Sequence, residues 1–199
     1  EGWQNLTAWE LKGEGSSLTI GTEHPIHTNN CHYATLTTTS IGATIENGGY
    51  DGIALKNGEL YDLNMVLRKV TDRSYKFAVS LVSEKDETLA KKNITVNNSN
   101  WKSIKITFKA TKNAERARLV ITPQTTGGID MDMISLFPRK TFKNRKNGLR
   151  ADLAQVIADL KPKFVRFPGG CAAHGNGLNN MYLWKRTIGK LEERQHMPN

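Results

Sequence analysis

An arginine followed by a proline and two glycines is the part of this sequence best suited to chemistry. The stretch FVRFPGGC (164–171) starts with apolar residues typical of a buried strand and continues into a loop without bulky side chains. Arg166 offers a rigid five-donor fork that would hold a facing carboxylate ionised by lowering its pKa. Gly169 and Gly170 let a ligand approach the backbone N–H groups closely. A buried structural ion pair beside a turn would use the same residues, so both interpretations stay open at this point.

The residues before this loop have the spacing of a helix followed by a strand. Asn147 can cap a helix that Lys161 and Pro162 would end. KFVRF (163–167) then predicts a short strand. A helix, a strand and a glycine loop form one step of a parallel sheet or barrel, where functional groups lie at the carboxyl ends of strands. The apolar residues that recur at helical intervals are Leu149, Leu153, Val156, Ile157 and Leu160.

Residues 1–136 follow a different pattern, because apolar and polar residues alternate with a period of two. LYDLNMVLRK (60–69) and WKSIKITFKA (101–110) are examples, and turn clusters such as ENGGYDG (46–52) separate such segments. Eight or nine short strands without a helix predict an antiparallel β-sandwich of the jelly-roll kind. We therefore predict two domains, a mainly β sandwich over 1–136 and a partial α/β barrel segment over 137–199.

The positive charge is confined to the second of these regions. Residues 1–136 hold fifteen Lys and Arg against fifteen Asp and Glu, whereas residues 137–199 hold thirteen against four. Much of the excess lies in PRKTFKNRKNGLR (138–150), which is either a basic linker or a surface that further chain would cover. No recognition helix, zinc finger or RNA-binding signature accompanies it, so we predict no nucleic-acid partner. No apolar run is long enough to span a bilayer, so we predict no membrane partner.

The C-terminal part resembles the α-L-arabinofuranosidases of glycoside hydrolase family 51. NGLRADLAQVIADLKPKFVRFPGGC (147–171) and NNMYLWKRTIGKLEER (179–194) carry the resemblance, and it extends more loosely over the sandwich through NNCHYATL (29–36) and NGGYDGIALKNGELY (47–61). The family implies a carbohydrate-binding-like sandwich followed by a (β/α)₈ barrel that removes terminal arabinofuranosyl residues of plant polysaccharides with retention of configuration. Arabinose-containing polysaccharides or oligosaccharides are then the expected partners.

The resemblance also implies roles for particular residues. Arg166 matches the arginine that supports the nucleophile, and Gly169, Gly170 and Cys171 match the floor of the substrate pocket. Retention requires two carboxylic residues about 5 Å apart, and in the family both are glutamates on later strands. Since no motif with either glutamate occurs before Asn199, we predict no catalytic residue in this chain and expect a fragment that is inactive by itself. The chain also opens without methionine or signal peptide, as expected for part of a longer protein, which we predict to be secreted or periplasmic.

Exposed aromatic residues of the sandwich are the candidates for sugar binding. Sandwich modules of this type stack sugar rings on aromatic side chains, although a tryptophan near a strand more often packs in the core. Tyr50 and Trp101 are our candidates, with Trp3 and Trp9 as further possibilities. The alternative is a sandwich that only braces the barrel. Asp132 matches a position that helps to hold calcium in related modules, but Asp130 and Asp132 alone do not make a calcium site, so no metal and no cofactor is predicted.

Overall fold

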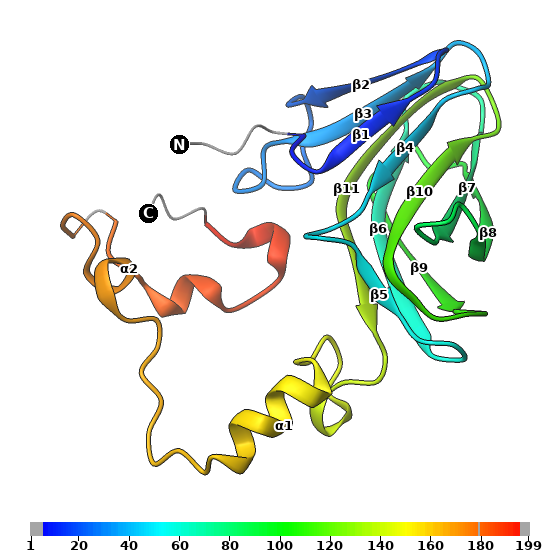
Figure 1. Cartoon of the computed structure of the whole chain (residues 1–199). Coiled ribbons are helices and arrows are strands. Elements are labelled where there is room, and N and C mark those ends of the chain that lie inside the picture. Colours follow the sequence, from blue (N-terminus) through cyan, green and yellow to red (C-terminus); the bar gives the residue numbers. More distant parts are fainter. Residues whose placement is uncertain (1–5, 179, 196–199) are drawn as a thin grey trace.

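Two antiparallel sheets pack face to face and make up most of the molecule (Figure 1). The computed structural model describes residues 6–178 and 180–195. In spatial order, the first sheet contains β1 (Trp9–Lys12), β4 (Thr44–Asn47), β10 (Ala114–Pro123), β7 (Tyr75–Val82) and β8 (Thr88–Val96), with β5 (Ile53–Leu55) also paired to β10. The second contains β2 (Ser16–Gly21), β3 (Tyr33–Thr38), β11 (Gly127–Pro138), β6 (Leu60–Lys69) and β9 (Lys102–Lys109). The predicted sandwich is confirmed.

The alternating apolar residues of these strands point inward, as their period of two predicts. One face of β6 is buried between the sheets, and β7 of the other sheet contributes a second buried row. Complete burial of such a side chain stabilises the fold by about 1.5–3 kcal/mol, so these two rows account for much of the core. Their members are Tyr61, Leu63, Met65, Leu67, Tyr75, Phe77, Val79 and Leu81.

The region after β11 contains short helices and no strand among its described residues. The predicted helix is confirmed as α1 (Ala151–Asp159). Its predicted cap is wrong, because Asn147 has a left-handed backbone (φ 50°) and Arg150 occupies the cap position without a side-chain hydrogen bond. The remaining elements are η1 (Phe142–Asn144), α2 (Gly170–His174), η2 (Trp184–Thr187) and η3 (Leu191–Glu193).

The predicted buried strand at residues 163–167 is wrong. Phe164, Val165 and Phe167 are 79–83% exposed, and the backbone there is irregular. A parallel strand needs a hydrogen-bonded neighbour and cover on both faces, and the described residues after β11 supply neither. The local sequence therefore has the composition of a buried strand without the partners that would make it one. The barrel itself is not visible in the structure.

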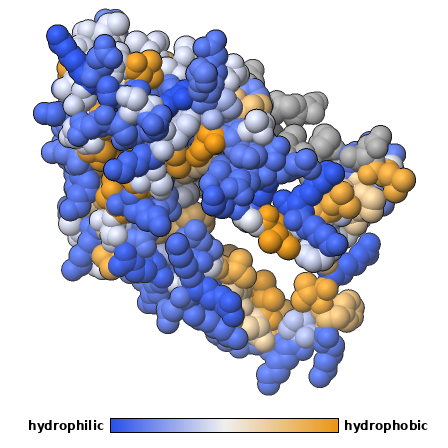
Figure 2. Space-filling view, turned by 180° about the vertical axis from the view of Figure 1, so that it is seen from behind, coloured by the Kyte–Doolittle hydropathy of each residue, from blue (hydrophilic) through white to orange (hydrophobic). Residues whose placement is uncertain are grey.

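The apolar face of α1 is also uncovered. Only Ala154 of this helix is buried, whereas Leu153, Val156 and Leu160 are 57–75% exposed. Figure 2 shows hydrophobic side chains at the surface of the C-terminal region, which stands away from the body of the sandwich. None of the described helices is long and apolar enough to cross a membrane.

Candidate functional site

The glycine loop at residues 166–171 lies at the surface of the C-terminal region. Gly169 (φ 78°) and Gly170 (φ 59°) both have left-handed backbones, which glycine adopts without the steric cost that a Cβ would add. A Cβ on Gly169 would also lie 3.2 Å from Nε of Arg166, because the arginine side chain folds back over the loop. The glycines therefore set the path of the chain between the arginine and α2.

Arg166 and Cys171 are both exposed, and no Asp or Glu carboxylate among the described residues forms an ion pair with Arg166. The loop brings Arg166, Gly169, Gly170 and Cys171 together on one stretch of backbone but presents no acid to them. The substrate-binding roles of these four residues stay predictions.

Tyr50 stands at the tip of the turn between β4 and β5 and is 97% exposed. Contacts on both sides of Tyr50 hold this turn in place. Asn47 Oδ1 accepts a hydrogen bond from the Gly49 backbone N–H (2.7 Å), and Asp51 forms an ion pair with Arg116 on β10 (3.3 Å). Gly52 (φ 95°) allows β5 to pass close to β10, because a Cβ there would lie 2.5 Å from Cα of Arg116. A fixed turn thus presents an uncovered aromatic ring to solvent.

Trp101 is placed differently, in an aromatic cluster on the outer face of the second sheet. The Arg68 guanidinium carbon lies 4.4 Å from the centre of the Trp101 ring and 4.9 Å from that of Tyr33. The two rings meet edge to face at 5.1 Å. Trp101 Nε1 also donates to the backbone carbonyl of His24 (2.9 Å). The indole N–H and the ring surface facing Arg68 are therefore already engaged within the protein.

Arg68 connects this aromatic cluster to β11 and to the loop after β2. Its Nε donates to Asp130 Oδ2 (2.7 Å), and its two terminal nitrogens donate to the carbonyls of His24 (2.7 Å) and Glu23 (3.1 Å). Tyr33 Oη donates to the Glu23 carbonyl as well (2.6 Å). The sequence analysis did not predict this cluster. The alternation along β6 and β11 places Arg68 and Asp130 on the outer face of the sheet, where they are register partners, and that pattern could have indicated the pair.

Asp130 and Asp132 have separate environments. Both oxygens of Asp130 are engaged, by Arg68 and by Thr35 Oγ1 (2.7 Å). Asp132 accepts hydrogen bonds from the Met133 backbone N–H (2.6 Å) and from Asn30 Nδ2 (2.8 Å). Burial raises the pKa of Asp132, and this outweighs the two hydrogen bonds that lower it. The described residues include no group of three or more His, Cys, Asp or Glu side chains arranged to hold a metal ion.

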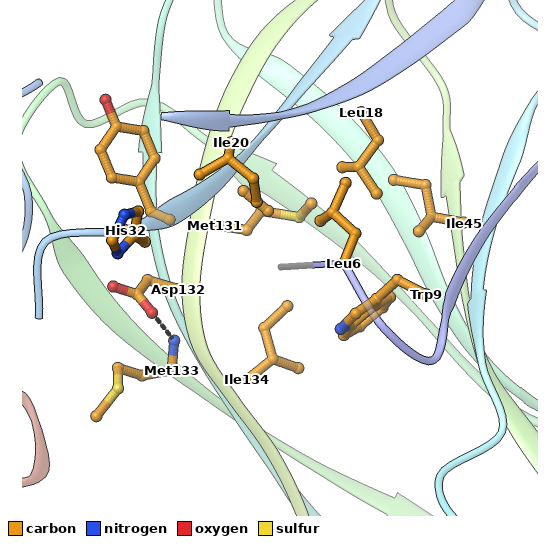
Figure 3. Close-up of a pocket in the computed structure, with 12 residues that line it drawn as sticks. Leu6, Trp9, Leu18, Ile20, His32, Ile45, Met131, Asp132, Met133 and Ile134 are labelled. Atoms are coloured by element: carbon orange, nitrogen blue, oxygen red, sulfur yellow. Dashed lines mark hydrogen bonds between the residues drawn. The ribbon is translucent and has the colours of Figure 1, made fainter. Parts of the chain in front are cut away.

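Asp132 lies at the rim of a hollow between the two sheets. The hollow has a volume of about 270 Å³, and its walls are mostly aliphatic (Figure 3). Trp9 lines it and is half-buried, so it belongs to the packing at this end of the sandwich. Trp3, the remaining candidate of the four, lies outside the described residues.

Comparison with known proteins identifies relatives along nearly the whole chain. An extracellular exo-α-L-arabinofuranosidase from Streptomyces chartreusis is 36% identical over 203 residues, which is 95% of this chain and 23% of that protein. α-L-Arabinofuranosidase 1 from Arabidopsis thaliana is 32% identical over 96% of this chain and 29% of its own length. The sequence model of the α-L-arabinofuranosidase 1 domain matches residues 156–199. The chain is related to the α-L-arabinofuranosidases.

Solved structures agree with this relationship. An arabinose-bound family 51 α-L-arabinofuranosidase superposes with a TM-score of 0.85 at 28% identity, over 95% of this chain and 32% of that one. A xylanase 10B structure from Clostridium thermocellum, with modules CBM22-1 and GH10, reaches 0.50 at 20% identity over 67% of this chain, which shows a shared fold only. The chain spans less than a third of the length of these arabinofuranosidases. The glycine loop lies inside the stretch that the family model matches.

Proposed function

We propose that this chain is part of a retaining α-L-arabinofuranosidase that acts on terminal arabinofuranosyl residues of plant polysaccharides. The observation that carries the proposal is similarity to named arabinofuranosidases over about 95% of the chain, in both sequence and structure. Arg166 would support the nucleophile, and the loop at 169–171 would form part of the substrate pocket. Secretion or export of the longer protein is part of the proposal, supported by the extracellular relative.

The chain by itself is proposed to be inactive. Its C-terminal region contains four acidic residues, none of which belongs to a catalytic motif. Asp152 is held by Arg150, Asp159 accepts a hydrogen bond from Gln155, and Glu193 forms an ion pair with Lys190. A retaining glycosidase needs one carboxyl group as nucleophile and another as acid/base. The proposal assigns both to chain beyond Asn199.

Hydrolysis of p-nitrophenyl α-L-arabinofuranoside tests this assignment. The longer protein should release p-nitrophenol, and NMR of the first product should show the configuration of the substrate. The 199-residue chain should release none above the uncatalysed rate. Enzyme-like turnover by the chain alone would refute its proposed inactivity, and a longer protein without this activity would refute the function.

The sandwich offers a second candidate function, which is binding of arabinose-containing glycans through Tyr50. Its 97% exposure on a fixed turn favours this role, because an aromatic ring that packs against nothing is available to stack on a sugar. Trp101 is the weaker candidate, since Arg68 and His24 already engage it. The alternative is a sandwich that only braces the barrel.

Calorimetry with arabinan and arabinoxylan oligosaccharides separates these two roles. If Tyr50 binds sugar, Tyr50→Ala should abolish the heat of binding, whereas Tyr50→Phe should preserve it because the ring remains. No binding by the unchanged chain at millimolar ligand would leave bracing as the role of the sandwich.

A further inference from the structure

The joint between the sandwich and α1 carries positive charge that the protein does not neutralise. Residues 138–150 contain six Lys and Arg and no acidic residue. Arg139 pairs with Asp62, Lys140 with Glu59 and Arg150 with Asp152. The three cations left are Lys143, Arg145 and Lys146, and among the described residues no carboxylate lies within 4.0 Å of them.

These three cations lie on a compact loop, residues 141–149, between β11 and α1 (Figure 1). The Phe142 N–H donates to the Leu149 carbonyl (2.9 Å), so a hydrogen bond joins the two ends of the loop. Thr141 is buried, and its hydroxyl donates to the Arg145 carbonyl. Because these bonds order the backbone that carries the charges, binding would cost less backbone entropy than on a flexible linker.

A hollow of about 260 Å³ opens beside this loop. Lys146, Asn144 and Asn147 line one part of it, and Phe137 and Pro138 form an apolar wall. Together these groups offer an ammonium, two amides and a surface for a ring. A sugar ring that bears a carboxylate matches this combination better than a bare anion does, because a bare anion makes no use of the wall.

The acidic residue in the hollow is already neutralised. Asp62 accepts hydrogen bonds from Arg139 Nε (3.0 Å), Arg139 Nη2 (2.5 Å) and Thr107 Oγ1 (2.7 Å). The hydrogen bond from Arg139 is the main cause that holds the pKa of Asp62 below its usual value, and the more distant charge of Lys146 adds a smaller lowering. Since Arg139 cancels the charge of Asp62, Lys146 leaves the hollow net positive.

We propose that this joint binds uronic-acid residues of acidic polysaccharides, with Lys146 on the carboxylate and Lys143 and Arg145 on neighbouring uronates. The choice of a glycan rests on the proposed carbohydrate-active function, whereas the charge requirement rests on the joint itself. The site would hold a longer enzyme on acidic regions of a polysaccharide whose neutral arabinose branches it removes.

Calorimetric titration of the 199-residue chain with oligogalacturonate tests the proposal. We expect binding that weakens as NaCl rises, whereas any heat from a neutral arabino-oligosaccharide should be unchanged when the three cations are replaced. Replacing all three cations, with Lys143→Gln, Arg145→Gln and Lys146→Gln, should weaken binding by about tenfold or more, which corresponds to about 1.4 kcal/mol. Lys146→Gln alone should give a smaller loss in the same direction.

A second triple variant with the same charge change is the control. Lys91→Gln, Lys92→Gln and Lys105→Gln remove three exposed lysines from β8 and β9, which likewise have no ion pair within the described structure. This variant should bind oligogalacturonate within about twofold of the unchanged chain if local rather than net charge decides. Both triples change exposed residues only, and equal thermal unfolding midpoints would show that each is folded.

Three results would overturn the proposal. Oligogalacturonate could fail to bind, both triple variants could lose the same affinity, or single-stranded DNA could bind equally tightly through the same three residues. None of these results bears on hydrolysis of p-nitrophenyl α-L-arabinofuranoside by the longer protein. The two proposals can therefore fail separately.

Discussion

Arg68 joins two strands, an aromatic pair and a loop in one cluster. Its guanidinium packs against two aromatic rings, and its nitrogens donate to one carboxylate and two carbonyls. The side chains of Arg68 and Asp130 are only 14% and 6% exposed, so neither charge is well hydrated. Removing one partner of such a pair leaves the other charge buried and uncompensated.

Arg68→Ala should therefore lower the free energy of unfolding by about 3–5 kcal/mol. Urea denaturation measures this, and Arg116→Ala is the matched control. The pair between Arg116 and Asp51 is 66% and 69% exposed, so its loss should cost less than about 1 kcal/mol. Equal losses in the two variants would show that Arg68 is no more than a surface cation. If Arg68→Ala does not fold, Arg68→Lys, which keeps the charge but loses the hydrogen bonds to Glu23 and His24, should give a smaller loss that still exceeds that of Arg116→Ala.

Asp132 should make stability fall as pH rises. Burial raises its folded-state pKa above the ordinary value of 3.8. Between these two values the folded chain binds more protons than the unfolded chain, so the free energy of unfolding decreases with pH. Asp132→Asn cannot ionise, so from about pH 4 upward the unchanged chain should lose stability relative to the variant. Parallel stability curves over this range, measured by urea denaturation, would contradict the assignment.

At the scale of elements, α1 forms although no other element covers the apolar face that its sequence pattern predicts to be buried. Its apolar residues recur at helical spacing, yet only Ala154 is buried. The helix therefore gains little from burial, and most of its apolar face contributes nothing to the stability of this chain.

Polar substitutions on that face should consequently be tolerated. Leu153→Gln combined with Leu160→Gln should change the free energy of unfolding by no more than about 0.5 kcal/mol. Leu63→Ala, in the fully buried core of β6, should cost about 2–5 kcal/mol in the same urea experiment. A comparable loss in the α1 variant would mean that the face is packed in solution.

At the scale of the whole molecule, the sandwich contains nearly all of the buried hydrophobic residues and the C-terminal region almost none. The main core cluster lies between the two sheets, and Ala154 is the only buried hydrophobic residue among those described after β11. A hydrogen bond from Asn29 Nδ2 to the Glu193 carbonyl (2.7 Å) connects the loop after β2 to η3. β11 continues to Pro138, two residues past the predicted end of the sandwich domain.

A chain shortened to end at Lys140 should therefore keep the sandwich. Its free energy of unfolding should lie within about 1 kcal/mol of that of the full chain, or roughly 3 °C in the unfolding midpoint. Calorimetry of the two chains measures this and tests the predicted division into two domains. Loss of cooperative unfolding in the shorter chain would show that the C-terminal region belongs to the same folding unit.

The sequence by itself determined the sandwich, α1 and the relationship to arabinofuranosidases. Alternation along β6 and the helical spacing of Leu153, Val156 and Leu160 are local patterns, so each is readable within a dozen residues. The glycines of the loop are readable for the same reason.

Only the tertiary structure decided whether residues 163–167 form a buried strand and whether Trp101 is free to bind a ligand. A buried strand depends on neighbours that its own residues do not encode, and without them this segment stays exposed. Trp101 depends on Arg68, which is fixed in turn by Asp130, 62 positions further along the chain. Tyr50 kept its solvent-facing position because a contact between near neighbours, from the Gly49 N–H to Asn47, helps to set its turn. Contacts between distant segments follow from strand order and register, which a single segment does not specify.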